Sequence, residues 1–456
     1  MNVLDSELAT SGLLQLGLTV AGSLRDADVI LFNTCSIRQH AEDKVYSALG
    51  RLTDWKGRNP HAVLGVLGCM AQKDQRLIFR RAPHVDFVLG PGQLDRLPSV
   101  VQTLLDAKTA DRTPQKELLV GLPRQQWKHR EVVESFRRYD PIRPVETRPR
   151  RFQALVRTMF GCDKFCTYCI VPSVRGPEQS RSPQEILDEV KTLTDQGALE
   201  ITLIGQTVNS YRFKDGEKTT RLPDLLARIA EIADVRRIRF VTNYPTGMDD
   251  DLLRAVRDLP KVCKHLHVPA QSGSDAVLKR MKRNYTVDDY RQLVDRIYGT
   301  IPEASMTSDF IVGFCGETEA EFTETVDLVK HGRFKNSFIF KYSERPGTKS
   351  AELFTDDVPE TVKKRRNNEL LAVQDSVSLE LNRRFIGRTV EVLVEGPDVS
   401  GNRLTGRTPC DRVVVFDGAL SLVGTFIELA IADAAPFTLF GVRGEGLETC
   451  NSSPPP

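Results

Sequence analysis

In the N-terminal part of the chain, short apolar runs alternate with segments whose apolar residues recur at helical spacing. Val29–Phe32 and Ala62–Leu67 have the length and composition of buried strands. Ser6–Leu16 and Ala41–Thr53 repeat apolar residues at the spacing of amphipathic helices. This alternation predicts a doubly wound α/β domain over residues 1–112.

A strand–loop–helix rhythm also fills residues 151–375. Helical patterns such as Pro183–Gln196 and Thr318–Lys330 separate six candidate strands. These are Phe152–Met159, Glu200–Ile204, Ile238–Thr242, His265–Val268, Met306–Val312 and Ser337–Tyr342. Six βα units predict an open, partial (β/α)6 barrel, whose chemistry belongs at the C-terminal ends of the strands.

The pattern changes to short strands over residues 376–443, where glycine and asparagine turns separate them. The candidate strands predict a small β-barrel; they are Thr389–Val394, Arg412–Phe416, Phe426–Ile431 and Phe437–Gly441. The tail at 444–456 is rich in serine and proline, so we expect it to be disordered.

A basic stretch without a clear period, residues 113–150, lies between the first two domains. Its cations alternate with aromatic side chains: Arg124, Trp127, Lys128, Arg130, Phe136, Arg137, Arg138, Tyr139, Arg143, Arg148 and Arg150. Two interpretations stay open. It is either a solvated interdomain linker or a strap that contacts RNA phosphates and bases.

The composition is that of an ordinary soluble globular protein, with 40% hydrophobic and 27% charged residues. No apolar run is long enough to span a membrane, and nothing resembles a signal peptide. Nine cysteines in such a chain indicate a reducing cytoplasm and thiolate chemistry. The net charge of +2 means that any nucleic-acid contact must depend on local patches.

Three cysteines with C-x3-C-x2-C spacing form the most informative motif: Cys162, Cys166 and Cys169. One short loop can direct all three thiolates at a cubane cluster and leave the fourth iron open. A structural zinc site prefers four ligands, and the nearest further candidates in sequence are His129 and Cys263. The ligand count therefore favours an open-site iron–sulfur cluster, with zinc or incidental buried thiols as the alternatives.

This loop resembles the signature of radical S-adenosylmethionine (radical SAM) enzymes. The resemblance implies a 4Fe-4S cluster whose open iron binds the amine and carboxylate of S-adenosylmethionine. Glycine-punctuated motifs follow several of the expected strands and together indicate a cofactor cleft. From these motifs we predict the cofactor-binding residues Gly205, Gln206, Asn209, Gln271 and Ser272.

Two further cysteines, Cys35 and Cys69, follow the two N-terminal strands, where open α/β sheets build ligand crevices. They are either ligands or buried core thiols. This region resembles methylthiotransferases, whose first strand ends in Gly-Cys-Gln-Met-Asn and whose three cysteines hold an auxiliary 4Fe-4S cluster. Met1-Asn2 coincides with the end of that motif, and Asp5 is the expected N-cap of the first helix.

The first strand and the third auxiliary ligand are thus expected to be absent from the chain as given. With only two auxiliary thiolates, we expect about one stable cluster, near four irons, and an unpaired sheet edge.

The C-terminal barrel resembles the TRAM domain, a small RNA-binding β-barrel. Its basic residues surround one strand pair, and we predict Arg388, Arg407 and Arg412 as RNA-binding residues.

The resemblance covers residues 1–443 and extends to the type of methylthiotransferase. Asn33–Arg38, Ala41–Tyr46, Ser308–Phe314 and Arg345–Thr348 are similar to the isopentenyladenosine (MiaB) type. This implies methylthiolation of C2 of N6-isopentenyladenosine at position 37 of tRNA, with two S-adenosylmethionine molecules per product.

The implied partners are tRNA and a reducing electron donor, and we expect a cytoplasmic monomer. The alternatives are a methylthiotransferase for threonylcarbamoyladenosine in tRNA or for a ribosomal-protein aspartate, and a cluster-bearing RNA-binding module without catalysis.

Overall fold

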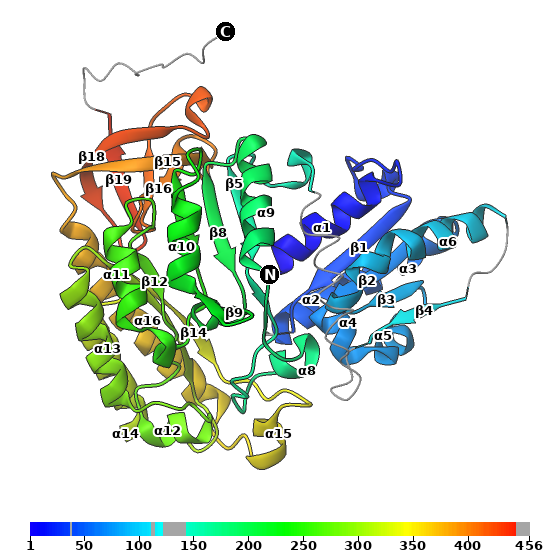
Figure 1. Cartoon of the computed structure of the whole chain (residues 1–456). Coiled ribbons are helices and arrows are strands. Elements are labelled where there is room, and N and C mark those ends of the chain that lie inside the picture. The colour runs from blue at the N-terminus through cyan, green and yellow to red at the C-terminus, as the bar shows by residue number, and fades with distance from the viewer. Residues whose placement is uncertain (37–38, 111–114, 122–142, 444–456) are drawn as a thin grey trace, which may run out of the picture. The chain divides into compact units, whose positions relative to one another are not determined.

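The computed structural model (Figure 1) describes residues 1–36, 39–110, 115–121 and 143–443. Predictions for the tail at 444–456 and for cations between 122 and 142 lie outside the described residues. The chain divides into two compact units, which are described separately. Unit 1 comprises residues 1–242, 280–282 and 343–356, and unit 2 comprises the remainder. None of the helices in the described ranges is long and apolar enough to cross a membrane.

The described residues of unit 1 form two parallel sheets, two two-stranded antiparallel sheets and the helices that pack on them. Its helices and strands are α1 (Asn2–Leu14), η1 (Leu24–Asp26), β1 (Val29–Thr34), α2 (Gln39–Arg51), α3 (Thr53–Arg58), β2 (Val63–Gly68), α4 (Cys69–Asp74), α5 (Arg76–Arg81), β3 (Phe87–Leu89), η2 (Pro91–Arg96), α6 (Leu97–Thr109), β4 (Glu117–Leu119), η3 (Val145–Thr147), β5 (Gln153–Arg157), β6 (Met159–Phe160), α8 (Val171–Arg175), β7 (Gln179–Ser180), α9 (Pro183–Asp195), β8 (Glu200–Ile204), η4 (Val208–Ser210), β9 (Arg212–Asp215), β10 (Lys218–Arg221), α10 (Leu222–Ala230), β11 (Arg237–Phe240) and α15 (Lys349–Leu353).

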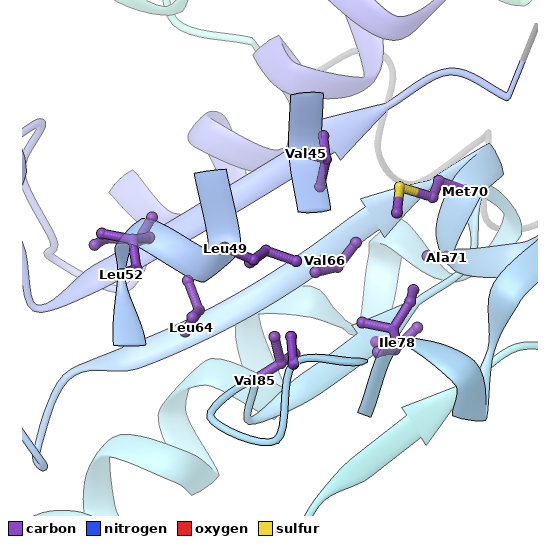
Figure 2. Close-up of a cluster of buried hydrophobic side chains, with 12 residues drawn as sticks. Val45, Leu49, Leu52, Leu64, Val66, Met70, Ala71, Ile78 and Val85 are labelled. Atoms are coloured by element: carbon purple, nitrogen blue, oxygen red, sulfur yellow. The ribbon is translucent and has the colours of Figure 1, made fainter. Parts of the chain in front are cut away.

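The N-terminal sheet is parallel, with strand order β1-β2-β3-β4. Its central strand β2 is buried along its whole length, as a strand covered on both faces must be. One face packs on α2, α4 and α5 through Leu49, Val66 and Ile78, which Figure 2 shows among their neighbours. The other face packs on α1 and α6 through residues such as Ala9 and Val101. The predicted doubly wound domain is therefore confirmed.

Two sequence expectations for this region are wrong. Asp5 is not an N-cap, because α1 begins at Asn2 and places Asp5 inside the helix, where it is fully buried. The expected domain end at 112 falls too early, because β4 lies inside the expected linker and pairs with β3.

Two arginines at the described end of the basic stretch are buried, which neither the solvated-linker nor the RNA-strap interpretation predicted. Arg143 is 2% exposed, and its guanidinium pairs with Glu7 at 2.8 Å and with Glu189 at 2.5 Å. Arg148 is 6% exposed. Buried charges require such partners, so Arg143 is a structural cation of unit 1.

The six strands expected for one barrel occur as two parallel three-stranded sheets. Unit 1 holds the order β11-β8-β5 and unit 2 the order β12-β13-β14. The elements of unit 2 are η5 (Pro245–Gly247), α11 (Asp250–Asp258), β12 (His265–His267), α12 (Asp275–Arg280), α13 (Val287–Thr300), β13 (Ser305–Val312), α14 (Glu319–Gly332), β14 (Asn336–Lys341), α16 (Glu360–Arg383), β15 (Thr389–Pro397), β16 (Leu404–Arg407), β17 (Val413–Phe416), η6 (Leu420–Leu422), β18 (Phe426–Ala434) and β19 (Thr438–Val442).

The C-terminal strands form a closed barrel in the order β15-β16-β17-β19-β18, which confirms the predicted small β-barrel. Its core contains Val392, Phe416, Leu429 and Leu439. Two details differ from expectation. The strand β16 was not predicted, and α16 runs without a break across the expected boundary at 376.

Candidate metal centres

The three-cysteine loop lies between β6 and α8, and the antiparallel pairing of β6 with β7 closes its base. Gly161 opens the loop at φ +70°, and a Cβ there would lie 1.9 Å from the carbonyl oxygen of Pro177. Only glycine fits this position. The amide of Cys162 donates to the carbonyl of Gly176 at 3.0 Å, so the first cysteine is fixed where the loop leaves the strand.

Thr167 anchors the middle of the loop to segments far away in sequence. Its amide donates to the carbonyl of Met281 at 3.0 Å and its hydroxyl to that of Arg280 at 2.9 Å. Its carbonyl accepts from the amide of Ser350 at 2.8 Å. These bonds hold the backbone between Cys166 and Cys169.

Two of the three loop thiols are shielded from water, as suits a cluster, and Cys169 is half-buried. Cys162 and Cys166 are each 9% exposed, and burial raises the pKa of Cys162 to about 11. A thiol of this kind becomes a thiolate when a metal displaces its proton. Within the described ranges no three His, Cys, Asp or Glu side chains converge as ligands of one metal ion. A cubane does not require such convergence, because each thiolate binds a different iron.

Cys35 and Cys69 directly follow the C-terminal ends of the neighbouring strands β1 and β2. Thr34 pairs with Gly68 in the parallel register of β1 and β2, so the cysteines are the next residues on neighbouring strands. A Cβ at Gly68, where φ is +88°, would lie 2.4 Å from Asn33 Oδ1, which shows how closely the two chains approach. Cys69 is 4% exposed and Cys35 is half-buried. This arrangement brings together two of the thiolates that an auxiliary cluster needs.

A buried ionic network adjoins Cys69. Asp5 accepts from Arg175 at 2.7 Å and from Arg157 at 3.1 Å, and all three side chains are at most 2% exposed. Burial alone would raise the pKa of Asp5, but Arg175 and Arg157 outweigh it and lower that pKa. The Nε–H of Arg175 donates to Cys69 Sγ at 3.2 Å. The sequence gives no sign that Arg175 contacts Cys69 and Asp5, because both partners lie more than a hundred residues earlier in the chain.

The predicted cofactor residues divide between the two units. Gly205, Gln206 and Asn209 follow β8 in unit 1, where a Cβ at Gly205 would lie 2.5 Å from Met159 Cγ. Gly205 therefore lies against the residue that begins β6, two residues before the cysteine loop.

Glu178 links this segment to the cysteine loop, and sequence reasoning missed it. It accepts from the Thr207 hydroxyl at 3.0 Å. Burial raises the pKa of its carboxyl, and the nearby Lys164 of the loop opposes that shift.

Gln271 and Ser272 lie in unit 2. Gln271 adopts a positive φ of 71°, which places its backbone against β13: its amide donates to the Asp309 carbonyl at 2.8 Å. Ser272 is 1% exposed, and its hydroxyl lies 3.3 Å from that of Thr325 on α14. The structure thus gives Ser272 a role inside unit 2, which does not fit the predicted cofactor contact.

The three arginines predicted to bind RNA differ in exposure. Arg388 is exposed beside Phe385, with 5.8 Å from its guanidinium to the ring centre. Arg407 is partly exposed and pairs with Asp411 at 3.1 Å. Arg412 is 8% exposed and its guanidinium contacts Asn382 inside unit 2. The prediction for Arg412 is therefore wrong, because a buried guanidinium does not reach a phosphate.

A cavity of about 760 Å³ opens in unit 1 among α2, α4, α5 and α8. Ile170 and Val174 form part of its wall and also pack against Cys69. Charged side chains, including Glu42 and Lys73, line the opposite part. The cavity therefore adjoins the Cys69 side of the candidate centre.

Three stretches of the chain match known families. Residues 156–329 match the Radical SAM superfamily, residues 1–90 the uncharacterized protein family UPF0004, and residues 383–442 the TRAM domain. The radical S-adenosylmethionine methyltransferase TsrM of Kitasatospora setae, solved with cobalamin and a [4Fe-4S] cluster, superposes with a TM-score of 0.54. That match covers 76% of this chain and 73% of TsrM at 15% identity, so it shows likeness of fold alone. The fold and the cysteine loop define a radical SAM protein.

Relatives identify the family within that class. The tRNA-2-methylthio-N(6)-dimethylallyladenosine synthase of Rhodopirellula baltica is 53% identical over 450 residues, which cover 97% of this chain and 93% of the relative. The protein of the same name from Syntrophotalea carbinolica is 41% identical over 448 residues, 97% of each chain. The chain belongs to the family of tRNA-2-methylthio-N(6)-dimethylallyladenosine synthases, as its sequence motifs indicate.

Proposed function

We propose that this protein methylthiolates C2 of N6-isopentenyladenosine (dimethylallyladenosine) at position 37 of tRNA. The observation that carries the proposal is the anchored loop that presents Cys162, Cys166 and Cys169 beside the Gly205 segment. Membership of a family named for this product supports the substrate. We infer two S-adenosylmethionine molecules per product, one for the radical step and one for the methyl group.

Cys162, Cys166 and Cys169 would hold the first 4Fe-4S cluster, and Cys35 and Cys69 would supply ligands to an auxiliary one. The first cluster, when bound, supplies the electron that cleaves S-adenosylmethionine for hydrogen abstraction at an unactivated carbon. Two buried loop thiols and a backbone clamped at Thr167 suit a cluster shielded from water.

The other residues near the loop position it. Glu178 accepts a bond from Thr207, and Lys164 lies close enough to affect its pKa, so Glu178 ties the cysteine loop to the Gly205–Asn209 segment. Gly205 keeps that segment against Met159 because any side chain would collide. These contacts support Gly205, Gln206 and Asn209 as cofactor-binding residues.

The tRNA would be bound in part by the C-terminal barrel. Arg388 is exposed and Arg407 is partly exposed, and the phosphate backbone of RNA favours such cations. We further infer a cytoplasmic monomer that requires a reducing electron donor.

Replacement of one loop ligand tests the radical centre. Cys166→Ala should lose cleavage of S-adenosylmethionine to 5′-deoxyadenosine after anaerobic reconstitution, because a cluster with two thiolates is bound poorly. Cys410→Ala is the matched control, since this half-buried thiol lies in the barrel. Undiminished deoxyadenosine formation by Cys166→Ala would refute the site.

The substrate is tested separately with three acceptors. Nucleoside mass spectrometry should detect the methylthio group in tRNA that carries N6-isopentenyladenosine. Modification of threonylcarbamoyladenosine tRNA or of a ribosomal-protein aspartate instead would replace the proposed substrate and leave the radical centre in place.

A further inference from the structure

The loop that carries the three cysteines also exposes an aromatic side chain. Phe165 lies between Cys162 and Cys166 in the sequence and is 41% exposed. Its φ of +50° is in the left-handed region, which is a strained conformation for a bulky residue. Such strain persists only where the surroundings enforce it, and it is concentrated at functional sites. The loop therefore holds the Phe165 ring in an exposed position at a cost in backbone energy.

A lysine from a distant segment faces this ring. Lys282 Nζ lies 5.8 Å from the centre of the Phe165 ring, and Lys282 is itself exposed, with a φ of +57°. Hydrogen bonds join the two backbones beside this contact, because Thr167 donates to the carbonyls of Met281 and Arg280. All of these residues belong to unit 1. Phe165 and Lys282 thus share one connected surface over the cysteine loop.

Further apolar and basic groups extend this surface. Ser350 at the start of α15 donates its amide to the Thr167 carbonyl, and Leu353 on the same helix is 64% exposed. Asp163 is an exposed acidic residue of the loop itself. Four of the five residues at 279–283 are cations, and none of the five is acidic: Lys279, Arg280, Lys282 and Arg283. We call the surface formed by Phe165, Lys282 and Leu353 the loop surface.

The loop surface fits an acidic protein better than a nucleic acid. Electron-transfer complexes have small interfaces, and opposite charges steer their association. The exposed ring and the exposed leucine supply apolar contact, and the cations supply the complementary charge. RNA is held mainly through its phosphates and by stacking of its bases. Leu353 offers neither a charge for a phosphate nor a ring for a base.

We propose that the loop surface is the docking site of an acidic one-electron carrier protein of the flavodoxin type. Lys282 attracts the acidic face of the carrier, and the Phe165 ring contacts it next to Cys166. The flavin hydroquinone anion of the carrier gives up one electron and becomes its neutral radical. That electron reduces the loop cluster, and no bond is formed or broken. This inference rests on the proposed function, because it requires a cluster in the cysteine loop.

Arg333 offers a matched control for Lys282. It is exposed, has a φ of +45°, and its guanidinium lies 4.7 Å from the ring centre of Tyr298. It lies just before the N-terminal end of β14, whereas the chemistry of such barrels belongs at the C-terminal ends of the strands. Aspartate tolerates left-handed backbone better than most residues. Lys282→Asp and Arg333→Asp therefore make the same change of charge at the same backbone conformation.

The full chain is reconstituted anaerobically with ferrous iron and sodium sulfide as wild type, Lys282→Asp, Lys282→Asn, Phe165→Asn and Arg333→Asp. Deoxyadenosine formation is measured with dithionite and, separately, with an acidic flavodoxin held in its hydroquinone form. Isothermal titration calorimetry with oxidised flavodoxin measures docking to each full-length protein without turnover. Iron content and circular dichroism confirm that each variant is loaded and folded.

We expect Lys282→Asp to lower the flavodoxin-driven rate and the affinity for flavodoxin roughly tenfold at low ionic strength, because charge steering can change association by that much or more. Lys282→Asn should lose less, and Phe165→Asn should weaken binding with little change in its salt dependence. Dithionite is a small reductant that does not dock, so the dithionite-driven rate of the Lys282 variants should equal that of wild type. High salt should bring Lys282→Asp and wild type together, because it screens exposed charges.

Four results would overturn the inference. One is a wild-type flavodoxin-driven rate in Lys282→Asp, and another is an equal loss in Arg333→Asp, which would assign the effect to net charge. The third is an equal loss with dithionite and flavodoxin, which would make Lys282 a support of the loop. The fourth is a loss of tRNA affinity in Lys282→Asp with unchanged flavodoxin binding, which would assign the surface to RNA.

The wild type with dithionite separates these outcomes from the proposed function. Deoxyadenosine formation in that sample would leave the radical centre in place, whichever result the variants gave. Its absence would instead refute the proposed function. A wild type that works with dithionite but neither binds flavodoxin nor is driven by it would overturn only the docking site.

Discussion

Asp5→Asn removes the central charge of a buried network while keeping the shape of the side chain. Asp5 has no exposed surface, and its two oxygens accept from Arg157 at 3.1 Å and from Arg175 at 2.7 Å. The amide keeps one acceptor oxygen and turns an NH2 group toward the other guanidinium. Two buried cations then lose their shared counter-ion.

Removing one partner of a buried ion pair costs about 3–5 kcal/mol. At roughly 2–4 °C per kcal/mol for a unit of this size, the unfolding midpoint should fall by roughly 6–20 °C. Glu380→Gln on α16 is the contrast, because its pair with Arg384 has side chains 70% and 52% exposed. Such surface pairs contribute about 0–1 kcal/mol.

The stability lost in Asp5→Asn relative to wild type should also depend on pH. Because Arg175 and Arg157 lower the pKa of Asp5 in the folded state, its contribution is complete above the unfolded pKa. It is lost as the pH falls through the lowered folded value. The difference between wild type and Asp5→Asn should therefore be constant from pH 5 to 8 and shrink only below about pH 4, the ordinary range of an aspartate.

Thermal unfolding followed by tryptophan fluorescence suits this test, because Trp55 lies on α3 of unit 1. A loss in Asp5→Asn no larger than that in Glu380→Gln would refute the reasoning. So would a deficit that stays unchanged down to pH 2, since protonated Asp5 carries no charge to lose.

Other predictions concern the loop and the barrel. Gly161→Ala should displace the cysteine loop and lower the iron content, because the new Cβ at residue 161 would lie 1.9 Å from the carbonyl oxygen of Pro177. Gly216→Ala, also at positive φ but with nothing within 4 Å, should lose only about 1 kcal/mol of stability and keep its iron. Arg388→Ala should weaken tRNA binding and reduce the salt slope of log K by about 1. Arg254 is an exposed arginine of α11, and Arg254→Ala should leave the affinity for tRNA unchanged in a filter-binding assay. An equal loss of affinity in Arg388→Ala and Arg254→Ala would contradict an RNA-binding surface on the barrel. Arg412→Ala should lower the unfolding temperature more than Arg388→Ala does, because the Arg412 guanidinium is buried and lies 4.5 Å from the ring centre of Phe385. Calorimetry of the two variants would contradict this prediction if Arg388→Ala had the lower unfolding temperature.

Local patterns predicted many of the elements, though not β16, and they predicted the main cysteine motif. The run at β8 was predicted with the same bounds, Glu200–Ile204, because its short length, flanking glycines and β-branched residues favour a strand over a helix. The spacing of Cys162, Cys166 and Cys169 lies within one loop, so the sequence alone identifies it. Family motifs along the chain identified the type of enzyme, which the relatives then confirmed.

Tertiary structure decided which charged residues are buried and what they contact. Asp5 reads locally as a helix cap, yet it meets Arg157 and Arg175, which lie 152 and 170 residues further along the chain. Arg143 and Arg412 read as solvated or RNA-facing cations, yet both are buried among partners from other elements. Periodicity and spacing report on neighbours within a few residues. The surroundings of a charge depend on segments brought together only by folding, and the bond between Arg175 and Cys69 is visible for the same reason only in three dimensions.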